Sequence, residues 1–290
     1  MNTLNDNYNK TNSVMVNGDD FTVTIFTDLH HSVKDVSTFY CTKALEKLDI
    51  IVKNSQDSEF FISLGDFVND LDKTTAYYDA AISHAEKLGI PYFSPTKEQK
   101  GKVLFNVIGN HETAFLPKSE FSKYVPYQHG IGSVYSFAKN GVLFVVVDAN
   151  FNRELVVDTP QIMQTTTQFT IPNNQIEYIN NLVKNQITKE IKSIVWLSHV
   201  AFKDIDDKKW ELAKVLSSFN RPIAIFEGHT HIGAKYSAES ENLKLDVYTL
   251  PPVTNDFTLG LDKREKTFSY CKVKFSNGQI ASVDYITDEI

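Results

Sequence analysis

The stretch Val107-Ile108-Gly109-Asn110-His111-Glu112 closes a mostly apolar run that begins at Val103. An apolar run of this length is typical of a buried strand, and this one stops at a glycine followed at once by three polar side chains. Polar groups placed directly after a strand lie at the mouth of a sheet, where binding and catalytic residues gather. Alone, the stretch is more typical of an ordinary turn, because Asn, Gly and His are common turn residues.

Four other stretches repeat this arrangement, in which polar residues follow an apolar run. They are Thr27-Asp28-Leu29-His30, Gly65-Asp66, Ser198-His199 and Gly228-His229-Thr230-His231. The apolar runs before them are 21–26, 60–64, 194–197 and 223–226. The chain has eight histidines, and five of them fall in these strand-end stretches. Carboxylate, imidazole and amide oxygen together suit hard or borderline divalent ions, so the pattern predicts a metal site at the ends of five strands.

Two pairs of candidate ligands are spaced two residues apart. Asp28 and His30 form one pair, and His229 and His231 form the other. In an extended or turn segment, residues at this spacing point the same way, so each pair can reach one ion or straddle two. Asp66 is the natural bridging ligand, because a carboxylate has two oxygens and can hold two ions at once.

His111 is expected to face the substrate. It is adjacent to Asn110, so the two side chains tend to point in different directions. If Asn110 binds metal through its amide oxygen, a protonated His111 near the ions can stabilise a transition state or protonate a leaving oxygen. The alternative is a histidine that orients its loop by hydrogen bonding.

Other polar residues near these stretches have simpler interpretations. We expect His31 to be a surface residue or one that supports a ligand from behind. Asn69 and Asp70 are interpreted as solvated loop residues, and His84, on a predicted helix, as a surface histidine. Arg153 is a candidate phosphate contact, although an arginine facing solvent is the favoured interpretation.

Bulk composition describes a globular chain without a nucleic-acid or membrane signature. Its 290 residues are 42% hydrophobic, which is ample for a core. The net charge of −7 argues against a broad basic face for nucleic acid. There is no apolar run near the roughly 18 residues of a membrane span, and residues 1–17 lack the apolar core of a signal peptide. Cys41 and Cys271 match no zinc spacing, so we expect two free thiols in a cytoplasmic protein.

The remaining chain predicts alternating strands and helices, followed by strands alone. Helical spacing runs from 39 to 52, 77 to 88 and 208 to 218, and another helix opens at Asn173. A hairpin joins 133–137 to 142–147, which ends at Asp148-Ala149-Asn150, a further polar strand end. The polar segment 150–172 is long enough to act as a lid or binding loop. Runs at 243–250, 267–275 and 280–286 predict antiparallel strands that close a second sheet.

Taken together, the order Asp-x-His, Gly-Asp, Gly-Asn-His-Glu, lone His and Gly-His-x-His resembles the calcineurin-like metallophosphoesterases. The five blocks span residues 28–231. The resemblance implies an α/β fold, a four-layer α/β/β/α sandwich of two mixed sheets flanked by helices. It implies one domain over 20–290 after a flexible arm at 1–19. The second block, Gly-Asp-Phe-Val-Asn-Asp, fits loosely, and the spacer 67–108 is long. Segments 70–101 and 150–172 are therefore candidate caps or lids.

The same resemblance implies a ligand set. One divalent ion would be held by Asp28, His30 and His231. The other would be held by Asn110, His199 and His229, while Asp66 would bridge both ions and His111 would be the acid or transition-state stabiliser. Mn²⁺ is our first choice, with Fe and Zn open, because mixed oxygen and nitrogen ligation does not decide among them.

The expected function is two-metal hydrolysis of phosphate esters, with a metal-bridging hydroxide attacking phosphorus in line. A small phosphodiester or nucleotide-diphosphate-type substrate is our leading expectation, and a phosphomonoesterase is the nearest alternative. A nuclease and a non-catalytic metal-binding scaffold are less favoured. We expect a small phosphorylated substrate as the partner, with no membrane and no nucleic acid. The sequence does not indicate an oligomeric state.

Overall fold

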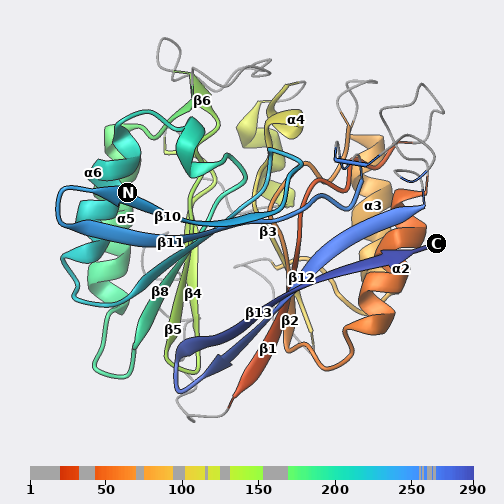
Figure 1. Cartoon of the computed structure of the whole chain (residues 1–290). Coiled ribbons are helices and arrows are strands. Elements are labelled where there is room, and N and C mark those ends of the chain that lie inside the picture. The colour runs from red at the N-terminus through yellow and green to blue at the C-terminus, as the bar shows by residue number, and fades with distance from the viewer. Residues whose placement is uncertain are drawn as a thin grey trace.

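Two mixed β-sheets pack face to face in this chain, and helices cover the outer face of each (Figure 1). The computed structural model describes residues 20–32, 43–69, 75–93, 102–114, 117–124, 131–152, 169–254, 256, 258–259, 263 and 266–290. The expected four-layer α/β/β/α sandwich is confirmed. Within this described part of the chain, no helix is both long and apolar enough to cross a membrane.

The first sheet has the strand order β13-β12-β1-β2-β3. Its parallel strands are β1 (Phe21–Phe26), β2 (Phe60–Ser63) and β3 (Leu104–Asn106). Its antiparallel strands are β12 (Thr267–Ser276) and β13 (Gln279–Glu289). Helices α2 (Ala44–Asn54) and α3 (Ala76–Lys87) pack on its outer face.

The second sheet has the order β10-β11-β9-β8-β5-β4. The central strands β5 (Val142–Val146), β8 (Ser193–Leu197), β9 (Ile223–Glu227) and β11 (Leu243–Thr249) are parallel. The antiparallel edges are β4 (Tyr135–Lys139) and β10 (Ala234–Ser240). Helices α5 (Asn173–Gln186) and α6 (Lys208–Ser217) cover this sheet. Short elements between these are α4 (Asn110–Thr113), η1 (Lys118–Lys123), η2 (Phe202–Asp204), β6 (Phe151–Asn152) and β7 (Phe169–Thr170).

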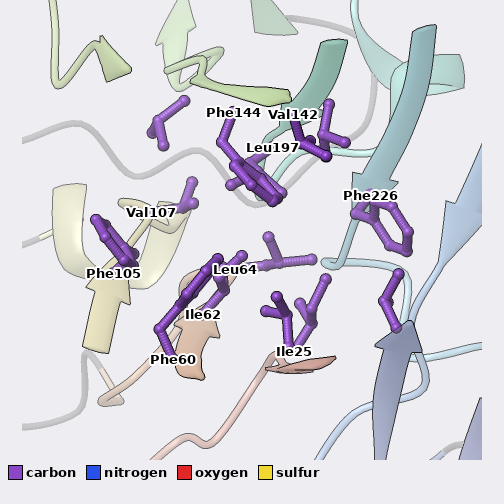
Figure 2. Close-up of a cluster of buried hydrophobic side chains, with 14 of the residues drawn as sticks. Ile25, Phe60, Ile62, Leu64, Phe105, Val107, Val142, Phe144, Leu197 and Phe226 are labelled. Carbon is purple, nitrogen blue, oxygen red and sulfur yellow. The ribbon is translucent and has the colours of Figure 1, made fainter. Parts of the chain in front are cut away.

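An apolar core fills the space between the sheets (Figure 2). Phe60 and Ile62 of β2 point into this space, whereas Phe61 points toward the helices. A strand buried on both faces requires a continuous apolar run, which is why Phe60, Phe61 and Ile62 of β2 follow one another without polar alternation. Aromatic rings join the two sheets, since Phe105 of β3 stacks on Phe137 of β4 with ring centroids 3.6 Å apart. The core therefore holds the two sets of strand ends in a fixed relation.

The C-terminal strands differ from the sequence prediction. The tail was expected to close a second sheet, but only β11 joins the six-stranded sheet, while β12 and β13 extend the five-stranded one. Without β12, β1 would be an edge strand of the first sheet. β12 pairs antiparallel with β1, and Phe275 lies opposite Phe21. Cys271 and Val273 of β12 then enter the core between the sheets. Strand β10 was not predicted, because its mostly exposed side chains give no apolar run.

The two candidate lid segments are described only in part. Within 70–101, α3 packs on the first sheet through Tyr78, Ala81 and Ile82. Within 150–172, the ends form β6 and β7. A lid role for either segment stays a prediction. The arm 1–19, Cys41, Asp70 and Arg153 lie outside the described residues.

Candidate metal centre

The predicted ligand side chains meet at one end of the sandwich. Strands β1, β2 and β3 run parallel in one sheet, and β5, β8 and β9 run parallel in the other. Because the carboxyl ends of parallel strands lie at the same edge, the residues that follow them are brought together. Three groups have ligand atoms within 4.8 Å of one another: Asp28, His30 and His231; His30, Asp66 and His111; and Asp66, His199 and His229.

The first group is arranged around one oxygen of Asp28. His231 Nε2 lies 3.2 Å from Asp28 Oδ1, and His30 Nε2 lies 3.7 Å from it. The other oxygen, Oδ2, accepts hydrogen bonds from Thr27 Oγ1 at 2.7 Å and from the His229 backbone N–H at 3.1 Å. Oδ1 is buried and accepts no hydrogen bond from the described residues. The protein thus holds one oxygen and directs the other at two imidazole nitrogens, an arrangement that suits a cation between them.

A further set, formed by Asn110, His199 and His229, is arranged around the Asn110 side chain. Its Oδ1 lies 2.8 Å from both His199 Nε2 and His229 Nδ1. His199 Nδ1 lies 2.9 Å from the carbonyl oxygen of Leu64. Because a carbonyl only accepts, Nδ1 carries a proton, and Nε2 is the atom that faces the centre. A ligand histidine whose second nitrogen donates to a carbonyl is the usual support at metal sites, so these residues fit a divalent ion.

Asp66 lies between the Asp28 group and the Asn110 set and faces a histidine of each. Its Oδ2 lies 3.2 Å from His199 Nε2, 3.7 Å from His30 Nε2 and 3.8 Å from His111 Nε2. Its Oδ1 accepts the His111 backbone N–H at 2.9 Å. The sequence argument gave both oxygens of Asp66 to the ions, but here the backbone takes Oδ1, and Oδ2 alone faces the imidazoles.

Five of the predicted ligands have left-handed backbone conformations. Their φ angles are +54° for Asp28, +45° for His30, +49° for Asp66, +70° for His229 and +55° for His231. Non-glycine residues rarely adopt this region, and each instance costs on the order of 1–3 kcal/mol. The spacing of two therefore brings paired ligands together through turns with left-handed residues, the second of the two conformations that the sequence argument allowed.

The strained turns are held by backbone hydrogen bonds between neighbouring strand ends. The N–H of Asp28 donates to Gly65 O at 3.0 Å, and that of His30 donates to Asp66 O at 2.9 Å. These bonds continue the parallel pairing of β1 with β2 beyond the strands themselves. The surrounding structure therefore determines the ligand conformations, as is required for strained residues at functional sites.

Burial and neighbouring charges set the protonation of the centre. Burial lowers the pKa of both His30 and His229 to about 4, so both imidazoles are neutral near pH 7. Burial acts against the charged form of His199 as well, but the adjacent Asp66 carboxylate outweighs it and raises the His199 pKa to about 9. Burial opposes ionisation of Asp66, yet His199 and His111 together hold the pKa of Asp66 well below its usual range. A cation binding here must displace the His199 proton that faces Asp66, because a metal ligand needs a deprotonated nitrogen.

Glu112 is a structural residue to which the sequence argument gave no role. Its fully buried carboxylate accepts backbone N–H bonds from Gly109 at 2.8 Å, Asp66 at 3.1 Å, Phe67 at 2.7 Å and Val68 at 3.1 Å. Burial, reinforced by the charge of Asp66, raises the pKa of Glu112 to about 7. Glu112 stands three residues after Gly109 and accepts its backbone N–H, which is half of a helix capping box, since glycine has no side chain to complete it.

Two glycines allow the loops to approach this closely. A Cβ on Gly109 would lie 2.1 Å from Asp66 Oδ1, and a Cβ on Gly228 would lie 2.0 Å from Thr27 Oγ1. Neither neighbour can move without releasing a ligand residue. Glycine at these strand ends is therefore a steric requirement of the centre.

Three expectations about nearby residues need revision. Asn69 was interpreted as solvated, but it is 2% exposed and its N–H donates to His31 O at 3.1 Å. For His31 the surface alternative is wrong, and its support of a ligand stays a prediction, because segments 28–31 and 66–69 run side by side past the ends of β1 and β2 and bury it. His84 is half-buried, with Nε2 2.5 Å from Asp49 Oδ1.

Comparisons with known proteins agree with this architecture. The sequence profile described as calcineurin-like phosphoesterase matches residues 21–233. A dimetal phosphatase from Danio rerio has a TM-score of 0.60 at 12% identity, over 93% of this chain and 98% of that chain, and so shares the fold. A 5'-nucleotidase from Candida albicans gives a TM-score of 0.47 at 14% identity, over 93% of this chain and 51% of that chain. No curated protein sequence matches this chain.

The role of Glu112 predicts a loss of stability in Glu112→Gln. Glutamine keeps the shape but replaces one accepting oxygen by an NH₂ group that faces backbone donors. We expect the free energy of unfolding to fall by about 3 kcal/mol, since each unpaired buried donor costs roughly 1–3 kcal/mol. Urea unfolding followed by circular dichroism in EDTA measures this. Glu86→Gln, at an exposed position of α3, is the control, and an equal effect in both variants would contradict the assignment.

Proposed function

The chain belongs to the calcineurin-like phosphoesterase family, and on that premise we propose that it is a two-metal hydrolase of small phosphate esters. The observation that carries the proposal is the pair of ligand groups that share Asp66 at the strand ends. Two ligand sets with a common carboxylate suit two ions held close together, the arrangement used for phosphate ester hydrolysis. The net charge of −7 favours a small substrate over nucleic acid.

In this proposal the ligands divide into the Asp28 group and the Asn110 set. Asp28, His30 and His231 would hold one ion, while Asn110, His199 and His229 would hold the other. Asp66 would be shared by both ions, because its Oδ2 faces His30 and His199. Mn²⁺ is the proposed ion, with Fe and Zn as the alternatives that mixed oxygen and nitrogen ligation also accommodates.

The chemistry divides between the ions and the protein. When bound, two divalent ions activate water as a nucleophile and offset charge on the phosphate oxygens. Asp28 and Asp66 each keep one oxygen fixed by hydrogen bonds, so their other oxygens stay oriented without rearrangement during the reaction. Most of the acceleration then comes from positioning and electrostatics, with no covalent enzyme intermediate.

His111 is the proposed general acid. Its side chain is 17% exposed, whereas those of Asp66 and His30 are 2% exposed, so His111 is the more accessible group beside the centre. The His111 ring stands edge-on to the His30 ring, with centroids 4.7 Å apart. From this rim His111 donates a proton to the leaving oxygen of a substrate.

A substrate comparison tests the reaction class. After EDTA treatment and restoration of Mn²⁺, Zn²⁺ or Fe²⁺, we expect metal-dependent hydrolysis of bis-p-nitrophenyl phosphate faster than that of p-nitrophenyl phosphate. This result supports a small phosphodiester or nucleotide-diphosphate-type substrate. Faster hydrolysis of the monoester would make the protein a phosphomonoesterase instead. Binding of two ions without turnover of either compound would contradict hydrolysis of simple esters.

The acid role of His111 predicts a selective effect of His111→Ala. We expect kcat to fall by roughly 10²-fold or more, the contribution typical of one acid–base group, with metal content and fold unchanged. Metal analysis, circular dichroism and steady-state kinetics measure the three quantities. His84→Ala, on the outer helix α3, serves as the matched histidine control. Loss of both ions from His111→Ala would show that the division of roles is wrong.

The bridging role of Asp66 predicts that Asp66→Asn weakens both ions together. Asparagine keeps an acceptor for the His111 N–H but removes the charge that both sites share. Isothermal titration with Mn²⁺, with metal content as a check, follows the two binding steps. Weakening of a single step would argue that Asp66 serves one ion only.

A further inference from the structure

Asp148, at the end of β5, lies at the centre of a buried polar cluster that the proposed reaction does not use. Asp148 is fully buried. Its Oδ2 accepts from Lys118 Nζ at 2.7 Å and from the Ser133 N–H at 3.1 Å. Lys118 Nζ also lies 3.3 Å from the centroid of the Phe151 ring. The buried carboxylate is thus paired and hydrogen-bonded, the condition under which a charge is tolerated in a protein interior.

The other oxygen of Asp148 holds Asn150. Asp148 Oδ1 lies 2.9 Å from the Asn150 backbone N–H and 3.2 Å from Asn150 Nδ2. Asn150 Nδ2 also donates to the carbonyl of Ile108 at 2.8 Å. Both neighbours of this amide nitrogen can only accept hydrogen bonds, so they fix the orientation of the Asn150 side chain. The Asn150 bond crosses from the second sheet to the first.

Ile108 stands two residues before Asn110, at the start of the turn that presents it. The N–H of Val107 still bonds to Ser63 O in the first sheet, and Gly109 is already bonded to Glu112. The Ile108 carbonyl lies between Val107 and Gly109, and it accepts the hydrogen bond that connects Asn150 of the second sheet to the turn. Its position sets the direction in which the chain enters Asn110.

The same cluster is also connected to His229, which lies beside Asn110. Asn150 forms an isolated parallel β-bridge with Thr170. Phe151 of β6 pairs with the same Thr170 of β7. Phe169 precedes Thr170 in β7, and its ring contacts the His229 ring edge-on, with centroids 5.2 Å apart. Asn110 and His229 are partners, because Asn110 Oδ1 lies 2.8 Å from His229 Nδ1. The cluster thus supports two members of one ligand set from opposite directions.

We propose that Asn150, held by Asp148 and Lys118, is a positioning residue that aims Asn110 at His199 and His229. The inference rests on the proposed function, in which these three residues hold one of two ions. Asn150 acts directly on this set, since its hydrogen bond to Ile108 reaches the turn that presents Asn110. In the other set, Asp28 and His30 come from the loop after β1, and His231 follows His229 in the loop after β9.

The test compares Mn²⁺ binding to the wild-type chain and to Asn150→Ala by isothermal titration and by electron paramagnetic resonance. We expect one dissociation constant to rise by about 10–100-fold, the effect typical of removing a group that supports a metal ligand. The other constant should change by less than about threefold, and the resonance signal should change from a coupled pair toward a single ion. Asn150→Ser, with a side chain too short to reach the Ile108 carbonyl, is the second variant and should behave alike.

Tyr135→Phe is the matched control for simple loss of stability. The Tyr135 hydroxyl also donates from the second sheet to a backbone carbonyl of β3, that of Asn106, at 2.7 Å. This bond holds the strand through a carbonyl that precedes the turn presenting Asn110. We expect Tyr135→Phe to lower the unfolding temperature while both Mn²⁺ constants stay within about twofold of wild type. A rise in one constant equal to that of Asn150→Ala would overturn the proposal.

A double-variant cycle tests whether Asn150 acts through Asn110. In an Asn110→Ala background, Asn150→Ala should leave the remaining Mn²⁺ affinity unchanged, because coupled residues are not additive. A further fall of the same size would mean that Asn150 acts elsewhere. If wild type binds two ions and Asn150→Ala binds both as tightly, this inference alone fails. If wild type binds no second ion, the proposed function fails first, and this inference fails with it.

Discussion

The four backbone N–H bonds to the Glu112 carboxylate are the interaction on which the rest of the centre depends. They join the loop after β2 to the turn after β3, although these segments have no regular pairing beyond the strands. Asp66 and Gly109 are both among the donors. The four donors satisfy the hydrogen-bonding capacity of the buried carboxylate. Through them, Glu112 fixes the positions of Asp66 and of the Asn110 turn together.

A second constraint is that the ligand loops combine strain with buried charge. Asp28 and Asp66 are ionised, buried and left-handed in backbone conformation, each of which opposes folding. The protein offsets this by giving one oxygen of each carboxylate to hydrogen-bond donors and the other to imidazoles. The result is a set of acceptor atoms that stay oriented toward a common point, the condition needed for strong selective binding of cations.

Much of the fold and of the site could be predicted from the sequence, because each of five apolar runs is followed directly by polar residues. The five strand-end stretches predicted the residues that meet, since parallel strands align their carboxyl ends. What could not be predicted depended on partners distant in sequence. The pairing of β12 with β1 put the tail in two sheets, and the continued pairing of the β1 and β2 loops buried Asn69. Glu112 links the two loops through donors at residues 66–68, which are distant in sequence. Its spacing of three from Gly109 indicates only the hydrogen bond within its own turn.

The bond from the His229 N–H to Asp28 Oδ2 joins residues that are 201 positions apart in the sequence. Closing so long a loop is entropically costly, and contacts of this kind form slowly during folding. The centre consequently has no counterpart in a fragment or in a nascent chain that lacks the second sheet. The two sets of candidate ligands can meet only after residues up to His231 have been made and the second sheet has packed on the first.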